Sequence, residues 1–69
     1  MALTVKEARE RKGFSQVDAG RAVGISEPTY RKYEREPWLM SIQTATELAR
    51  VLEVEFVDLK LEPPAREED

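Results

Sequence analysis

The sequence predicts an all-α fold, a compact bundle of five short helices, on three observations. The first four segments that favour helices follow Ser or Thr residues, and the first three stop at Gly or Pro, the residue types that begin and end helices. Apolar residues inside these segments recur three and four positions apart, which is the helix period. The chain of 69 residues has no cysteine and no histidine, so its small core depends on helix packing or on a partner chain.

The first two predicted helices span residues 5–12 and 16–23. Each follows an N-cap residue with an acidic residue three positions later, which is a capping-box pattern. Each is also followed by a glycine that can adopt the left-handed backbone found at helix ends. The N-caps are Thr4 and Ser15, and the glycines are Gly13 and Gly24.

The third predicted helix occupies residues 26–35, with Ser26 as its N-cap. Only residues 24 and 25 separate that cap from the second helix, so a very tight turn joins the two helices. Pro28 falls in the first turn of the third helix, where its missing N–H costs nothing, and Pro37 ends the helix. The tight turn makes the helices cross steeply and leaves one face of the third helix exposed.

The fourth predicted helix runs from the N-cap Ser41 to about Leu52. Its apolar stripe consists of Ile42, Ala45, Leu48, Ala49 and Leu52. Residues 56–61 are predicted as a short fifth helix with Phe56, Leu59 and, less strongly, Val57 turned inward. A short strand over residues 54–57 is the second interpretation, because apolar and polar residues alternate there. Residues 62–69 are expected to be a disordered acidic tail, which leaves residues 1–61 as the domain.

Composition excludes several classes of function. Without cysteine or histidine the chain has no thiol nucleophile, no imidazole base and no His/Cys metal site, and we expect neither catalytic residues nor a cofactor. No small-molecule ligand is expected in so short a chain. No apolar stretch approaches the roughly 20 residues of a membrane span, and the N-terminus lacks a signal core, so the expected location is cytoplasmic.

Charge is distributed unevenly along the chain. The net charge is −3, but residues 1–35 hold eight Lys and Arg against five acidic residues, whereas residues 36–69 hold three against nine. A polyanion responds to the local face of a protein rather than to its average charge. The basic first half, which contains the tight turn, is therefore compatible with binding to nucleic acid.

Residues 16–26, followed by Tyr33 and Glu34, resemble the helix-turn-helix of the Cro and phage-repressor (XRE-like) family. The flanking residues 12–16 and 41–44 match the same register, and the resemblance covers about residues 3–61. It implies the lambda-repressor-like fold of five helices and binding to operator DNA, commonly as a homodimer. Departures from the family are Glu36 in place of the usual glycine, the small Ala19, and an apolar loop at residues 38–40.

The resemblance also implies roles for individual residues. The exposed face of the third helix would read bases with Ser26, Glu27, Pro28, Arg31 and Lys32. Phosphate contacts would come from Ser15, Gln16 and Arg35, and an internal salt bridge would join Arg9 and Glu34. The chemistry is suitable, since Arg or Lys can donate to guanine and Glu can accept from cytosine. The plainer alternatives are a simple helix start for Ser15 and Gln16 and an ordinary solvated face for the others.

Trp38, Leu39 and Met40 allow three interpretations, namely a cap on the core, a dimer contact or a contact with another protein. Taken together, the sequence predicts a repressor-like transcriptional regulator that binds double-stranded DNA as a homodimer, in the cytoplasm and associated with the nucleoid. The alternative is a protein-binding helical module of the same fold that has no DNA binding, such as an antirepressor, an antitoxin-like factor or an assembly subunit.

Overall fold

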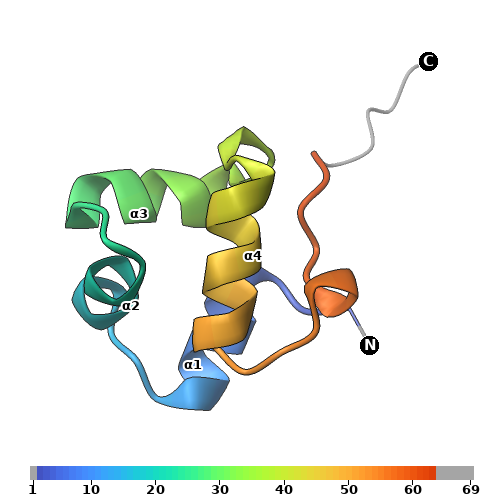
Figure 1. Cartoon of the computed structure of the whole chain (residues 1–69), viewed down its shortest axis with the longest axis horizontal. Helices are drawn as coiled ribbons and strands as arrows, with labels where there is room; N and C mark the ends of the chain where they lie inside the picture. Colours follow the sequence, from blue (N-terminus) through green and yellow to red (C-terminus); the bar gives the residue numbers. More distant parts are fainter. Residues whose placement is uncertain (1, 64–69) are drawn as a thin grey trace.

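A computed structural model describes residues 2–63 of the chain (Figure 1). These residues form four α-helices and two short 3₁₀ turns. The helices are α1 (Val5–Lys12), α2 (Gln16–Val23), α3 (Glu27–Arg35) and α4 (Ile42–Val51), and the turns are η1 (Pro37–Leu39) and η2 (Phe56–Asp58). In Figure 1, α2 and α3 lie on one side, α4 runs through the middle, and η2 lies on the other side.

The helix boundaries follow local hydrogen bonding. Thr4 Oγ1 accepts from the Glu7 backbone N–H at 3.0 Å, and the Glu7 carboxylate accepts from the Thr4 N–H at 2.9 Å. Ser15 and Asp18 form the same reciprocal pair at the start of α2. Gly24 has a φ of 77°, in the left-handed region. The predicted capping boxes and the predicted glycine turn are therefore confirmed.

The core lies where α1, α2, α3 and α4 meet. Its buried members are Val5, Ala8, Ala19, Tyr30, Leu48, Ala49, Leu52 and Leu59. The approach of α3 to α2 depends on a small residue at position 20, because a Cβ on Gly20 would lie 3.1 Å from the Ile25 carbonyl oxygen and 3.2 Å from Tyr30 Cβ. The absence of a side chain at Gly20 thus fixes how closely α3 sits on the bundle.

The predicted fifth helix is wrong, and the described residues contain four α-helices. Residues 56–58 form a single 3₁₀ turn, after which Leu59 is extended and pairs with Leu3 in an isolated parallel bridge. The Leu3 N–H donates to the Asp58 carbonyl at 2.8 Å, and the Lys60 N–H donates to the Leu3 carbonyl at 2.7 Å. A six-residue helix has too few internal hydrogen bonds to repay its nucleation, so pairing with residue 3 prevails. The second interpretation, a strand over residues 54–57, is not observed either.

Two predicted inward-facing residues are exposed. Ile42 is 72% exposed, although Ala45, Leu48 and their neighbours in the same stripe are buried. The first turn of α4 extends past the edge of the core, so helical periodicity alone misplaced this residue. Val57 is 84% exposed, because a 3₁₀ turn aligns residues three positions apart and turns Phe56 and Leu59 inward instead.

Three expectations from the sequence concern membrane spans, metal sites and the acidic tail. Within residues 2–63, no helix is long and apolar enough to cross a membrane. The same residues contain no group of three or more acidic side chains arranged to hold a metal ion. Of the predicted acidic tail, residues 62 and 63 are exposed, and residues 64–69 lie outside the described part of the chain.

Candidate nucleic-acid interface

The turn between α2 and α3 presents the third helix. The Gly24 N–H donates to the Arg21 carbonyl at 3.2 Å, and the Ile25 N–H donates to the Gly20 carbonyl at 2.9 Å, so α2 ends in a closed loop. Ser26 then begins α3, its hydroxyl accepting from the Thr29 N–H. The chain passes from one helix to the next within three residues, and α3 packs on α2 through one face only.

The opposite face of α3 is open to solvent and carries cations. Pro28, Arg31, Lys32 and Arg35 are exposed, as is the N-cap Ser26. Glu27 is half exposed and lies 3.9 Å from a guanidinium nitrogen of Arg31, too far for a hydrogen bond. All five residues predicted to read bases are therefore accessible, which is the first requirement for contact with a ligand as large as DNA.

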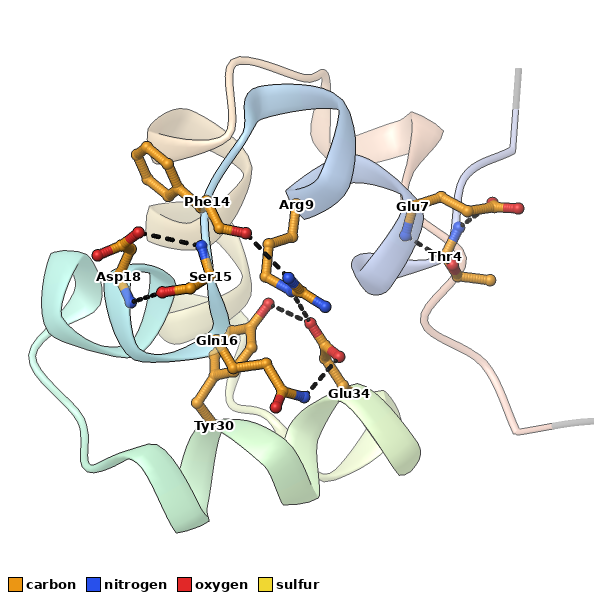
Figure 2. Close-up of polar contacts among 9 residues, drawn as sticks. All are labelled: Thr4, Glu7, Arg9, Phe14, Ser15, Gln16, Asp18, Tyr30 and Glu34. Atoms are coloured by element: carbon orange, nitrogen blue, oxygen red, sulfur yellow. Dashed lines mark hydrogen bonds and ion pairs between the residues drawn. The ribbon is translucent and has the colours of Figure 1, made fainter.

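On its inner face, α3 is held by a cluster of Arg9, Gln16, Tyr30 and Glu34, called here the Glu34 cluster (Figure 2). Among the described residues, the Glu34 carboxylate accepts three hydrogen bonds: from Arg9 Nε at 2.5 Å, from the Tyr30 hydroxyl at 2.8 Å and from Gln16 Nε2 at 3.1 Å. The Arg9 and Glu34 side chains are only 11% and 7% exposed. The cluster therefore ties α1, α2 and α3 together.

The cluster shifts the pKa values of its members. Burial alone would raise the pKa of Glu34, but the hydrogen bonds from Arg9, Tyr30 and Gln16 outweigh it and lower that pKa. The hydrogen bond to Glu34 raises the pKa of Arg9, while burial and the adjacent carboxylate raise the pKa of Tyr30. The pair of Arg9 and Glu34 is therefore ionised at neutral pH, and its charges are internally balanced.

The three residues predicted to contact phosphate have different surroundings. Ser15 is exposed, but its side chain caps α2. Gln16 is half buried, and its amide donates one hydrogen to Glu34, leaving the second amide hydrogen for another acceptor. Arg35 is exposed at the end of α3. The structure thus brings Gln16 and Glu34 into one cluster that sequence reasoning had divided between two roles.

Two contributions escaped sequence reasoning. The Tyr30 hydroxyl was not predicted to bond with Glu34, although the spacing of four residues on one helix was a usable signal. Lys6 was not singled out, yet it lines an open hollow with Gln16, Arg31, Glu34 and Arg35. Nothing in the local sequence marks Lys6, because its place beside α3 depends on how α1 packs.

The apolar loop after α3 has one side chain on the core and two in solvent. Met40 is half buried and packs against the core, whereas Trp38 and Leu39 in η1 are 39% and 45% exposed. The exposed Ile42 follows directly at the start of α4. The predicted segment therefore packs on the core through Met40 and leaves three apolar side chains exposed near one another in the sequence, Trp38, Leu39 and Ile42, called here the η1 patch.

Comparison with known proteins assigns the family. A helix-turn-helix family model matches residues 5–59, which include all four helices and the turn at Gly24. No curated protein and no solved structure matches the chain. The match covers most of the 69 residues. The chain therefore belongs to the helix-turn-helix family of the Cro and phage-repressor (XRE) type.

Proposed function

We propose that this protein is a sequence-specific regulator of transcription, repressor-like, that binds double-stranded DNA with α3 in the major groove. The observation that carries the proposal is the two-sided character of α3. Its inner face is held by Tyr30 and Glu34, and its outer face presents Pro28, Lys32 and Arg35 to solvent. An exposed helix with cations on its free face fits the major groove, which is about 12 Å wide.

The residues on that face have distinct proposed roles. Lys32 donates to guanine O6 or N7, and Glu27 accepts from cytosine N4. Pro28 offers an apolar surface to a thymine methyl group, and Ser26 bonds with a base edge near the helix start. Ser15, Gln16 and Arg35 contact phosphates and fix the position of α3 in the groove. Acting on chromosomal DNA, the protein would work in the cytoplasm in association with the nucleoid.

A homodimer is part of the proposal. Two copies would place two α3 helices in successive major grooves, about 34 Å apart. The η1 patch supplies an apolar contact, since aromatic residues are enriched at protein interfaces. The oligomeric state is measured by light scattering. We expect a dimer for the parent chain and a monomer for Trp38→Ser, whereas a parent that is monomeric at all concentrations would refute this part.

DNA binding is tested in two steps. Duplexes are first selected from a random pool with the full chain, and their affinity is then measured between 50 and 200 mM salt. We expect an enriched sequence bound at least about 10³-fold more tightly than random DNA, with an affinity that falls steeply with salt. Absence of enrichment together with a flat salt dependence would refute the proposed function.

The contribution of Lys32 is tested on the selected duplex. Lys32→Ala should weaken binding by about 5- to 150-fold and relax the preference at one base pair, as expected for loss of a base contact. Arg50→Ala is the matched control, because it also removes one positive charge, but from α4, where Arg50 pairs with Glu47. If the two variants bind alike, the base-reading role of Lys32 is wrong.

A protein-binding module of the same fold is the second candidate. It is favoured by the exposed Trp38 and Leu39 and by the net charge of −3. The selection experiment separates the two candidates, since such a module would enrich no duplex. In that case the η1 patch, rather than the α3 face, would be the surface sensitive to substitution.

A further inference from the structure

The hollow where α1, α2 and α3 meet is lined by side chains suited to an anion. It is open to solvent, encloses about 340 Å³, and is bordered by Lys6 from α1, Gln16 from α2, and Arg31, Glu34 and Arg35 from α3. Lys6 and the two arginines thus come from two different helices and converge on one space. This arrangement lies next to the outward face of α3 that carries Lys32, and Arg35 borders both.

The charge in the hollow is positive in spite of Glu34. Both oxygens of that carboxylate already accept hydrogen bonds within the Glu34 cluster, and the charge is balanced by Arg9. Within residues 2–63, neither Lys6 nor Arg35 has a side-chain hydrogen bond or ion pair. Arg31 has only the loose contact with Glu27 at 3.9 Å. These cations can therefore turn to a ligand without giving up a strong partner.

Helix geometry places Arg31 at the edge of the exposed face of α3, on the side next to this hollow. Arg31 is three residues before the buried Glu34 and four residues after Glu27, so the three side chains lie along one side of α3. Lys32 is displaced from Arg31 by about 100° around the helix axis, since a turn takes 3.6 residues. Arg31 thus borders α1 and α2, while Lys32 points away from them.

Gln16 adds an uncharged hydrogen-bond donor to the lining of the hollow. Figure 2 shows its amide directed from α2 toward Glu34 on α3, where one of its two hydrogens is used. The hydrogen bond to Glu34 holds the amide in one orientation. Its remaining hydrogen, with the ammonium of Lys6 and the guanidinium of Arg31, provides donors from three helices for one tetrahedral oxyanion.

We propose that this hollow binds one phosphate of the DNA backbone through Lys6, Gln16 and Arg31. The inference rests on the proposed function and deepens it. It adds Lys6 as a contact, and it assigns Arg31 to the backbone instead of the base edge that sequence reasoning favoured. Arg31 then contributes affinity without sequence information, whereas Lys32 carries base discrimination. Glu34 is a positioning residue that orients Gln16.

The test compares salt dependence with base preference on the selected duplex. Lys6→Gln and Arg31→Gln should each lower the slope of log affinity against log salt by about 0.9 and weaken all sequences by the same factor. Lys32→Gln should change the base preference, and Arg50→Gln should change neither quantity. An unchanged slope in Lys6→Gln, or an altered base preference in Arg31→Gln, would overturn the assignment.

A second measurement does not depend on DNA binding. Inorganic phosphate is added to the full-length chain and followed by ¹⁵N NMR, observing the Gln16 side-chain amide and the Arg31 Nε. Both signals should shift in a saturable manner in the parent and much less in Lys6→Gln. Signals that shift no more than those of Arg50 would overturn the phosphate site. If phosphate binds here but no duplex does, the proposed function fails while the anion site stands.

Discussion

Replacing Glu34 by glutamine tests how far the fold depends on the Glu34 cluster. The substitution keeps the shape of the side chain but removes the charge that balances Arg9, whose side chain is 11% exposed. Breaking one partner of a buried ion pair costs about 3 to 5 kcal/mol. We expect about 3 kcal/mol, the lower end of that range, because Arg9 keeps its hydrogen bond to the Phe14 carbonyl.

The assay is urea unfolding followed by circular dichroism. A small domain loses about 1 kcal/mol of unfolding free energy per molar urea, so the transition midpoint should fall by about 3 M. Since domains have about 5 kcal/mol or somewhat more in total, the variant should keep about 2 kcal/mol and remain mostly folded in buffer, with a transition at low urea. The control is Glu47→Gln, which breaks the exposed ion pair with Arg50 and should cost less than about 1 kcal/mol.

A second variant tests the reason for the loss. If the unpaired charge is responsible, Arg9→Met combined with Glu34→Gln should be more stable than Glu34→Gln alone, because the buried cation is gone. A double variant no more stable than the single one would refute the reasoning. So would a Glu34→Gln midpoint within about 0.5 M of the parent, since that would place the loss in the range of exposed pairs.

The same carboxylate makes stability depend on pH. The pKa of Glu34 is lowered in the folded state, so the unfolded chain binds more protons and stability rises with pH in that range. The contribution is fully present above the ordinary glutamate value of 4.5 and is lost as the pH falls through the folded value. The hydrogen bonds from Ser15 lower the pKa of Asp18 as well, so Asp18 also makes stability rise with pH on the acid side. We expect Glu34→Gln to flatten the acid side of the stability profile, and an unchanged profile would contradict this.

Three further predictions concern backbone and packing. Gly24→Ala should lower the free energy of unfolding by about 1 kcal/mol in urea, because Gly24 has a left-handed φ of 77° that strains an alanine, although nothing crowds the position of its Cβ. A variant as stable as the parent would show that this strain is absent. Glu53→Gly should raise Tm by about 2–4 °C, because glycine removes the backbone strain of a φ of 60° and the ion pair lost with Lys12 is exposed and weak. A lower Tm would mean that the ion pair is worth more than the strain. Leu48→Ala should lower the free energy of unfolding by about 2–5 kcal/mol, because Leu48 is buried, and Ile42→Ser should lower it by less than about 0.5 kcal/mol, because Ile42 is exposed. Equal losses would mean that Ile42 is covered in solution.

Local interactions made most of the helices predictable. A cap and its partner are three residues apart, as in Thr4 with Glu7 and Ser15 with Asp18, so the sequence alone specifies where α1 and α2 begin. The left-handed backbone at Gly24 is likewise a property of one residue. The turn and the register of α3 follow from these, and with them the residues that form the exposed face.

Features that depend on distant segments were not predictable in the same way. Leu59 pairs with Leu3 instead of continuing a helix, and no local pattern reports that the two meet. Ile42 has the spacing of a core residue, but burial requires a neighbour to cover it, and the core ends before the first turn of α4. Periodicity indicates which residues share a face of a helix, but it does not indicate how far along the helix a neighbouring element covers that face.

The candidate site shows the same division. Sequence alone determined that a helix follows a tight turn and carries Arg31 and Lys32, because caps, glycine and periodicity act within one turn of helix. Only the tertiary structure decided that Lys6 of α1 borders the same hollow as Arg31, and that Gln16 bonds to Glu34. Those contacts join separate helices, and their geometry is set by the packing of α1, α2 and α3 on a shared core rather than by the residues next to them in the chain.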